Sequence, residues 1–396
     1  MENNKNPNIR FKGFTDPWEQ RKLGDIITEY KETVDSDCTL PILTSSKTEG
    51  VILQEEHFGR KQQHDITGYN ILPRNYCTYR NRSDGVDFTF NINKCCDKGI
   101  ISKFYPVFSG KNSDVFFLSL VLNNSEEVVR EIAYTCTGTG QKVLSFLDLQ
   151  KMKVRVPNFD EQKEIAAYFD SFDHLITLHQ RKYNKLLNVK KSMLEKMFPK
   201  NGSNIPEIRF KGFTDPWEQR KLGDCFTERV ESMPDGELIS VTINDGIKKF
   251  SELGRHNNSN DDKSKYKKVC IGDIAYNSMR MWQGASGYSP YEGIVSPAYT
   301  VLSPNSGINS KCLAYQFKLP EMIHTFQINS QGITSDNWNL KYPALSEIEI
   351  FVSKNEKEQA KIAEYFEGLD RLITLHQREL EKLQNIKKSM LEKMFV

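Results

Sequence analysis

The sequence lacks a long apolar segment, a strong net charge and any CxxC pair of cysteines. Its longest apolar stretch, Val115–Leu122, is interrupted by Ser119 and is far shorter than the roughly 20 residues that cross a bilayer. The first residues, MENNKNPN, are polar, so we expect neither a secretory signal nor a membrane span, and we expect a cytoplasmic location. For the eight cysteines we expect reduced thiols and no structural metal site.

Catalytic signatures are also missing. Gly110-Lys111-Asn112-Ser113 has Tyr105 where a phosphate-binding loop requires its first glycine. No Gly-rich cofactor loop, no Asn/Asp-Pro-Pro-aromatic box of amino-methyltransferases and no supported Ser/His/Asp or Cys/His set is found. We therefore predict no catalytic residue. The net charge of +2 means that any DNA-binding surface must be a local arrangement of basic residues.

What the sequence does contain is a long repeat. Residues 161–198 (EQKEIAAYFDSFDHLITLHQRKYNKLLNVKKSMLEKMF) return as residues 358–395, with 26 of 38 positions identical. Apolar residues recur in both copies at helical, seven-residue spacing, which predicts two helices of roughly 55 Å each. Such a heptad pattern requires a partner helix, and we expect each copy to be the partner of the other.

The repeat extends beyond these helices. Ile9–Asp25 is identical to Ile208–Asp224 over all 17 residues, so the chain is a duplicated domain with its connector rather than a solenoid. We predict a first conserved segment and variable domain over 1–157, a long helix and linker over 158–204, the repeated segment and second variable domain over 205–354, and the last helix over 355–396.

The two variable blocks, roughly 31–157 and 229–354, differ in sequence but share landmarks such as Gly99–Ser102 and Gly293–Ser296. Short β-prone runs alternate with turn-rich stretches, and helices are expected near 117–134 and 310–328. This pattern predicts an α+β fold for each block with a mostly antiparallel sheet. Two unlike blocks on one repeated frame indicate that each block recognises something different.

This doubled frame resembles the specificity (S) subunit of a type I restriction–modification system. The residues that carry the resemblance are LGD at 23–25 and 222–224, the EQ pairs at 161 and 358, and the LITLHQR and KKSMLEKMF segments. The resemblance covers essentially the whole chain. One departure is that Ser353 stands where the first copy has Pro157 before its long helix.

The resemblance implies two target recognition domains, each of which reads one half of a split, asymmetric sequence in double-stranded DNA. It implies that the long helices pack antiparallel as a spacer, and that two modification (methyltransferase) subunits and the restriction (endonuclease/translocase) subunits assemble on this chain. S-adenosylmethionine, ATP and Mg²⁺ are then expected on the partner subunits, with no cofactor, no metal and no catalysis on this chain.

Base reading requires paired donors and acceptors, such as Arg for guanine and Asn or Gln for adenine, with aromatic residues nearby. The candidates fall in the turn-rich stretches of each block. In the first block they are Ser45, Ser46, Lys47, Thr48, Tyr79, Arg80, Asn81, Arg82, Lys103 and Lys142; in the second they are Thr242, Asn244, Asn277, Arg280, Trp282, Gln283, Ser330 and Gln331.

Four residues of the identical segments, Trp18, Leu23, Trp217 and Leu222, are candidates for partner binding, with core packing as the alternative. Two other classes of function stay open at this point. One is a stand-alone DNA-binding regulator, against which the lack of a helix-turn-helix counts. The other is a coiled-coil scaffold that never touches DNA, against which the divergence of the two blocks counts.

Overall fold

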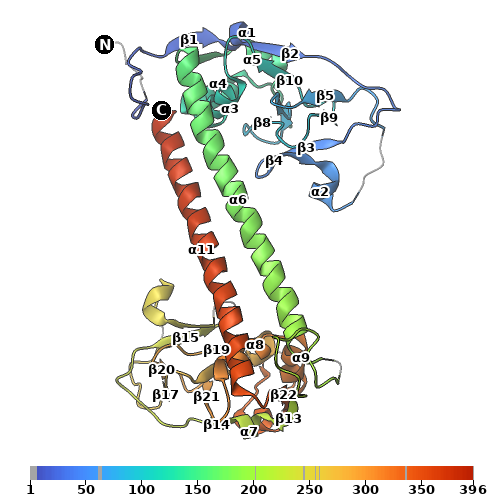
Figure 1. The fold of residues 1–396 in the computed structure, drawn as a ribbon. Helices are drawn as coiled ribbons and strands as arrows, with labels where there is room; N and C mark the ends of the chain where they lie inside the picture. The colour runs from blue at the N-terminus through green and yellow to red at the C-terminus, as the bar shows by residue number, and fades with distance from the viewer. Residues whose placement is uncertain are drawn as a thin grey trace. The chain divides into compact units, whose positions relative to one another are not determined.

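The structure is a computed structural model that describes residues 7–60, 65–200, 202–243, 246–254, 256–257, 259–334 and 337–395. The chain forms two compact units (Figure 1). The first consists of Met1–Gln180 with Arg378–Val396, and the second of Arg181–Gln377. Two helices of 39 residues, α6 (Phe159–Met197) and α11 (Glu356–Met394), each contribute one part to each unit.

Each unit contains the same four-stranded antiparallel sheet. In the first unit the strand order is β2 (Ile27–Tyr30), β10 (Val107–Gly110), β6 (Cys77–Tyr79) and β8 (Phe90–Ile92). In the second unit it is β14 (Phe226–Glu228), β21 (Tyr299–Pro304), β18 (Ile274–Asn277) and β19 (Ser286–Tyr288). The predicted α+β class with an antiparallel sheet is confirmed.

Shorter antiparallel pairs surround each sheet. In the first unit they are β1 (Glu19–Lys22) with β12 (Lys153–Val156), β3 (Leu43–Ser46) with β4 (Gly50–Leu53), β5 (Asn70–Pro73) with β9 (Lys98–Ile101), and β7 (Arg82–Ser83) with β11 (Lys142–Val143). In the second unit they are β13 (Glu218–Lys221) with β22 (Glu349–Val352), β15 (Ile239–Thr242) with β16 (Gly246–Lys249), and β17 (Lys267–Val269) with β20 (Gly293–Val295).

Short helices complete both units. The first contains α1 (Leu23–Ile26), α2 (Gln54–Phe58), α3 (Val115–Asn124), α4 (Glu126–Thr135) and α5 (Phe146–Lys151). The second contains α7 (Leu222–Cys225), η1 (Phe250–Leu253), η2 (Met281–Gln283), α8 (Ser310–Gln316), α9 (Pro320–Ile328) and α10 (Tyr342–Ser346). Among the described helices, none is both long and apolar enough to span a membrane.

The two long helices are antiparallel within each unit (Figure 1). In the first unit, Phe169 near the start of α6 lies with its ring centroid 6.3 Å from that of Phe395, which follows α11. In the second unit, Phe198, which follows α6, stacks 6.2 Å from Phe366 near the start of α11. Each core is thus completed by the end of the helix that belongs to the other repeat, as the heptad pattern predicts.

A buried ion pair joins the repeated N-terminal segment to the start of the long helix in both units. Arg10 donates to both carboxylate oxygens of the buried Glu161, at 2.9 and 2.5 Å, and Arg209 donates to both oxygens of Glu358 at 2.8 Å. The hydrogen bond to Glu161 raises the pKa of Arg10. Bidentate guanidinium–carboxylate pairs have a defined geometry, so they fix where the helix meets the segment.

The glutamines next to these glutamates hold the turn before each helix. The Gln162 side chain donates to the Pro157 carbonyl at 2.9 Å, and Gln359 donates to the Ser353 carbonyl at the same distance. The hydroxyl of Ser353 also donates to Glu358 at 2.6 Å. The serine in place of proline in the second copy therefore keeps the same hydrogen bond, because the backbone carbonyl accepts it, although Gln359 lies six positions after Ser353 and Gln162 only five after Pro157.

The shared glycines of the two blocks have a steric cause. A Cβ on Gly99 would lie 2.5 Å from Cδ1 of Leu43, and a Cβ on Gly293 would lie 2.5 Å from the carbonyl oxygen of Glu237. These distances are shorter than van der Waals contact. Glycine at these positions therefore lets β9 and β20 lie close to the neighbouring segments that contain Leu43 and Glu237.

We expect Glu161→Gln to lower the free energy of unfolding of the first unit by about 3 kcal/mol, because the Arg10 charge would remain largely buried without its carboxylate. Urea unfolding followed by tryptophan fluorescence measures this change. Glu164→Gln, on an exposed position of the same helix, is the control and is expected to change stability by less than about 0.5 kcal/mol. Equal effects of the two substitutions would contradict the role of the pair.

Candidate nucleic-acid interface

In the first unit, the β3–β4 hairpin carries Ser45 and Ser46 at the end of β3 and Lys47 and Thr48 in the turn that follows. The Asn91 side chain on β8 donates to the Ser45 hydroxyl at 2.8 Å and to the Ser46 carbonyl at 2.9 Å. Lys47 forms an ion pair with Asp87, which also accepts from Ser83 at 3.0 Å. The hairpin turn therefore lies against the loop that contains Arg82.

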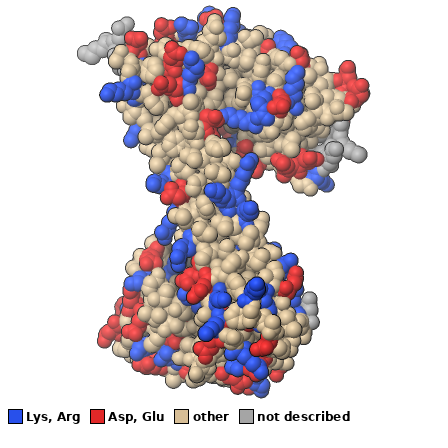
Figure 2. Space-filling view, viewed as in Figure 1, with Lys and Arg blue, Asp and Glu red and all other residues tan. Residues whose placement is uncertain are grey.

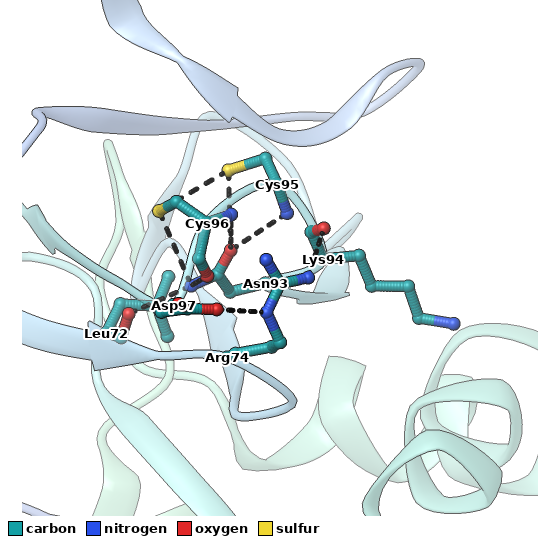
Figure 3. A network of polar contacts seen from close by, with 7 residues as sticks. All are labelled: Leu72, Arg74, Asn93, Lys94, Cys95, Cys96 and Asp97. Atoms are coloured by element: carbon teal, nitrogen blue, oxygen red, sulfur yellow. Dashed lines mark hydrogen bonds and ion pairs between the residues drawn. The ribbon is translucent and has the colours of Figure 1, made fainter.

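The strand β8 that carries Asn91 is itself held by a polar turn (Figure 3). Asn93 is fully buried, donates to the Leu72 carbonyl at 2.9 Å and accepts from the backbone amides of Cys95–Cys96 at 3.1 and 3.4 Å. Arg74 closes the turn by donating to Asp97 at 2.8 Å. These hydrogen bonds join the chain after β8 to Leu72 on β5, and the residue after β5 to the residue before β9.

Basic candidates of the first unit meet around an exposed aromatic ring. The guanidinium of Arg82 lies 4.6 Å from the ring centroid of Phe104, and the ammonium of Lys103 lies 5.9 Å from it. Lys142 pairs with Ser83 in the β7–β11 ladder, which brings it to the same loop. Phe104 is not among the candidates from the sequence, although an aromatic residue directly after the candidate Lys103 indicates a candidate base contact.

Asn81 and Arg80 belong to the same loop. The backbone N–H of Asn81 donates to the Phe104 carbonyl at 2.9 Å, and the backbone carbonyl of Asn81 accepts from the Leu144 N–H at 3.0 Å. Arg80 is exposed. The structure therefore brings together the candidates of the first block, with one exception.

That exception is Tyr79, for which the prediction of a DNA contact is wrong. Its side chain is fully buried, its hydroxyl donates to the Leu144 carbonyl at 3.1 Å, and its ring lies 4.8 Å from Phe90. Burial raises the pKa of Tyr79 far above the ordinary value for tyrosine. Tyr79 is the last residue of β6, whose three residues are all buried, whereas Arg80 directly after the strand is exposed.

In the second unit, the loop from Asn277 to Gln283 forms the corresponding surface. Arg280 is exposed, and the Trp282 ring nitrogen donates to the Met279 carbonyl at 3.1 Å. The Trp282 ring meets Trp338 edge to face at 5.2 Å. Trp338 is a second aromatic residue that the sequence analysis did not select.

A second loop joins this surface. The backbone N–H of Gln331 donates to the Asn339 backbone carbonyl at 3.0 Å, and the backbone N–H of Asn339 donates to the Gln331 carbonyl at 2.8 Å. The Leu340 amide donates to the Ser278 carbonyl at 2.9 Å, which connects this loop to the Asn277–Gln283 loop. Gln331 is therefore held close to the Arg280 loop, although the two are far apart in sequence.

The remaining candidates of the second block are hydroxyl and amide residues. The Ser330 hydroxyl donates to the Phe326 carbonyl at 2.7 Å, and the Thr242 hydroxyl donates to the Gly246 carbonyl at 3.2 Å. The Ser330 hydroxyl thus bonds to the last turn of α9, and the Thr242 hydroxyl bonds to the partner strand β16. Asn244 lies outside the described residues.

The structure contradicts the four candidates for partner binding. Trp18, Leu23, Trp217 and Leu222 are buried in the cores of their units. The Trp217 ring nitrogen donates to Glu358 at 3.2 Å, so this tryptophan supports the buried ion pair. Their identity between the repeats reflects packing of the shared frame, and their side chains are not available to a partner in this structure.

The charge pattern agrees with recognition by local surfaces. In Figure 2 basic and acidic side chains are interspersed on the face shown. Among the residues that the structure describes, no group of three or more His, Cys, Asp or Glu side chains is arranged to hold a metal ion. A duplicated α+β unit with a polar and aromatic loop surface is the architecture of a modular recognition protein.

Comparison with known proteins identifies the family. Residues 15–188 and 214–385 match the model for the type I restriction modification DNA specificity domain, so the chain belongs to this family. It is a DNA-specificity subunit of the type I restriction–modification class, a non-catalytic recognition chain.

Two similar proteins agree with this assignment. The chain is 23% identical to the type I restriction enzyme MjaVIII specificity subunit of Methanocaldococcus jannaschii. The 315 aligned residues cover 74% of this chain and 73% of that protein. The crystal structure of a type I restriction–modification S subunit from M. genitalium matches with a TM-score of 0.58 at 13% identity, over 99% of both chains. At 13% identity, the similarity to the M. genitalium structure shows that the two chains share a fold.

We expect Tyr79→Phe to lower stability by about 1 kcal/mol, because the Leu144 carbonyl would lose its hydrogen bond inside the core. DNA discrimination should stay unchanged. Arg82→Ala is the matched variant on the surface and should show the reverse, with stability within about 0.5 kcal/mol and weaker DNA binding. Urea unfolding and duplex titrations measure both quantities, and a DNA defect in Tyr79→Phe at full stability would refute the assignment to the core.

Proposed function

We propose that this chain directs a type I restriction–modification complex to a two-part sequence in double-stranded DNA, with one half read by each variable block. The observation that carries the proposal is the contrast within the repeat. The frames share the same buried Arg–Glu pair and the same sheet order, whereas the loop surfaces differ in their residues. A shared frame with unlike loops suits a reader of two different half-sites.

The proposed contact residues have the required chemistry. In the first block they are the hairpin turn Ser45–Thr48 with Arg80, Asn81, Arg82, Lys103, Phe104 and Lys142. In the second they are Thr242, Asn277, Arg280, Trp282, Gln283, Ser330 and Gln331, together with Trp338. Arginine and amide side chains provide the paired donors and acceptors that distinguish bases in the major groove, and the lysines would hold phosphates.

We also propose the domain limits 1–157, 158–204, 205–354 and 355–396, with the long helices as the spacer that sets the number of unread base pairs between the half-sites. Each helix continues without a break from one unit into the other, which supports this role. Half-site spacing in other two-part readers is likewise a property of protein geometry.

The partners would be two modification subunits and the restriction subunits. S-adenosylmethionine, ATP and Mg²⁺ would belong to those subunits, and the complex would act in the cytoplasm.

Docking of the modification subunits is assigned here to exposed leucines of the repeated LITLHQR segment. Leu175 and Leu178 in the first unit are 41% and 38% exposed, and Leu372 and Leu375 in the second are 44% and 52% exposed. Apolar side chains that recur on the outer face of both copies suit two copies of one partner.

The function is tested by exchanging residues 31–157 for the corresponding block of another specificity subunit. Methylation sequencing of DNA modified by the complex should show a change in one half-site only, because the second block keeps its own loops. The unmodified chain is the control. A change in both half-sites would refute independent reading, and no sequence preference in the parent complex would refute the function itself.

The docking assignment is tested by the double variant Leu175→Glu with Leu178→Glu. It should lose one of two bound modification subunits, because two carboxylates would have to be desolvated at one docking surface. Thr177→Glu, an exposed position between them in sequence, is the control that should retain both subunits. Native mass spectrometry counts the bound subunits, and retention of both by the double variant would exclude the leucines.

A further inference from the structure

One lysine of the second unit has an unusual environment. Lys318 lies in the short connection between α8 and α9, flanked by the buried Phe317 and Leu319. Its ammonium donates to the Gly284 carbonyl at 2.6 Å and to the Ile243 carbonyl at 3.1 Å. Both partners are backbone oxygens, so the side chain connects two segments of chain rather than pairing with a carboxylate.

The two carbonyls belong to the two loops that carry candidates for reading the second half-site. Ile243 follows β15 directly and is next to Thr242. Gly284 ends η2 in a left-handed conformation, with φ of 81°, directly after Trp282 and Gln283. The ammonium therefore joins Ile243, directly after β15, to Gly284, at the end of the Arg280 loop.

The site favours these bonds. Hydrogen bonds from an ionised donor are stronger than neutral ones, and burial strengthens them further. Burial, together with the smaller effect of the positive charge of Lys190, lowers the pKa of Lys318 to about 8. Because the buried ammonium has lost part of its hydration, its hydrogen bonds to the two carbonyls are needed to offset the cost of desolvation.

The first unit has a different residue at the equivalent place. Asn123 stands nine residues after the helix cap Asp114, as Lys318 stands nine residues after the cap Asn309. Asn123 accepts from the Phe90 amide at 3.0 Å and donates to the Phe90 carbonyl at 2.8 Å. The asparagine thus holds a single residue of β8, whereas the longer lysine reaches two separate loops.

We propose that Lys318 is a positioning residue for recognition of the second half-site, which sets the spacing between the Thr242 turn and the Asn277–Gln283 loop by bonding to both backbones. The inference rests on the proposed function of the second block. Lys318 acts through the loops that it joins and is not itself a base contact, because its donors are directed to protein carbonyls.

The test uses the chain in complex with its modification subunits. Affinities are measured for the recognised duplex, which methylation sequencing of the parent complex identifies, and for duplexes with one base pair changed in either half-site. The variants are Lys318→Met, which removes the donors at similar length, and Lys318→Arg, which keeps a charged donor. Lys311→Met is the matched control, since Lys311 lies on α8 but pairs with Glu367 at 3.0 Å.

Lys318→Met should reduce discrimination in the second half-site by about tenfold, roughly the effect of one mismatched base pair, and leave the first half-site unchanged. Lys318→Arg should restore most of it, and Lys311→Met should behave as the parent. Should Lys318→Met fail to give a soluble complex, Lys318→Gln, with a shorter reach, is measured instead and must show the same loss.

Three results would overturn the inference: undiminished discrimination in the second half-site, an equal loss in both half-sites, or a uniform loss of affinity with a smaller salt dependence. The last would assign Lys318 to a phosphate. If the parent complex shows no two-part preference, the proposed function fails, whereas a normal parent with a normal Lys318→Met variant refutes only the positioning role.

Discussion

The rest of the structure depends on the buried pairing of arginine and glutamate between the repeated segment and the long helix. Arg10 with Glu161, and Arg209 with Glu358, fix where each helix begins relative to the strand pair beside it. Removal of one partner would leave a charge largely without water or counterion, so both members must be kept. This constraint applies equally to both copies of the frame and places no demand on the loops.

The frame and the loops obey different physical requirements. The buried residues of the frame are packed inside the cores, so a substitution there creates a cavity or an unpaired charge, and Ser353 in place of Pro157 keeps the hydrogen bond from the glutamine side chain. Loop residues are partly solvated, and many replacements there cost little stability. The connection under the loops differs as well, with Asn123 in one unit and Lys318 in the other. Loop residues can therefore change with little effect on the packing of the frame.

Sequence reasoning was accurate wherever a pattern repeats along the chain. The heptad spacing predicted the long helices and that each is the partner of the other, whereas their antiparallel direction was implied by the family resemblance. The shared Gly99 and Gly293 marked equivalent strands. It failed where exposure depends on the residue at which a buried strand ends. Tyr79 was selected together with its exposed neighbours, yet it points into the core. Trp18 and Trp217 were candidates for partner binding because they lie in the segments that are identical between the two repeats. Both are buried, and packing in the two cores also requires the same residue.

The sequence by itself determined the duplicated organisation, the two long helices, the α+β class and the family, because periodicity and repetition are properties of the linear chain. Only the tertiary structure decided which polar residues meet. The Ser330–Gln331 turn reaches the Arg280 loop through a backbone bond from Leu340 to Ser278, and Lys318 reaches two carbonyls separated by 41 positions in the chain. Contacts between distant segments depend on how strands and turns close in space, and neither spacing nor composition records that closure.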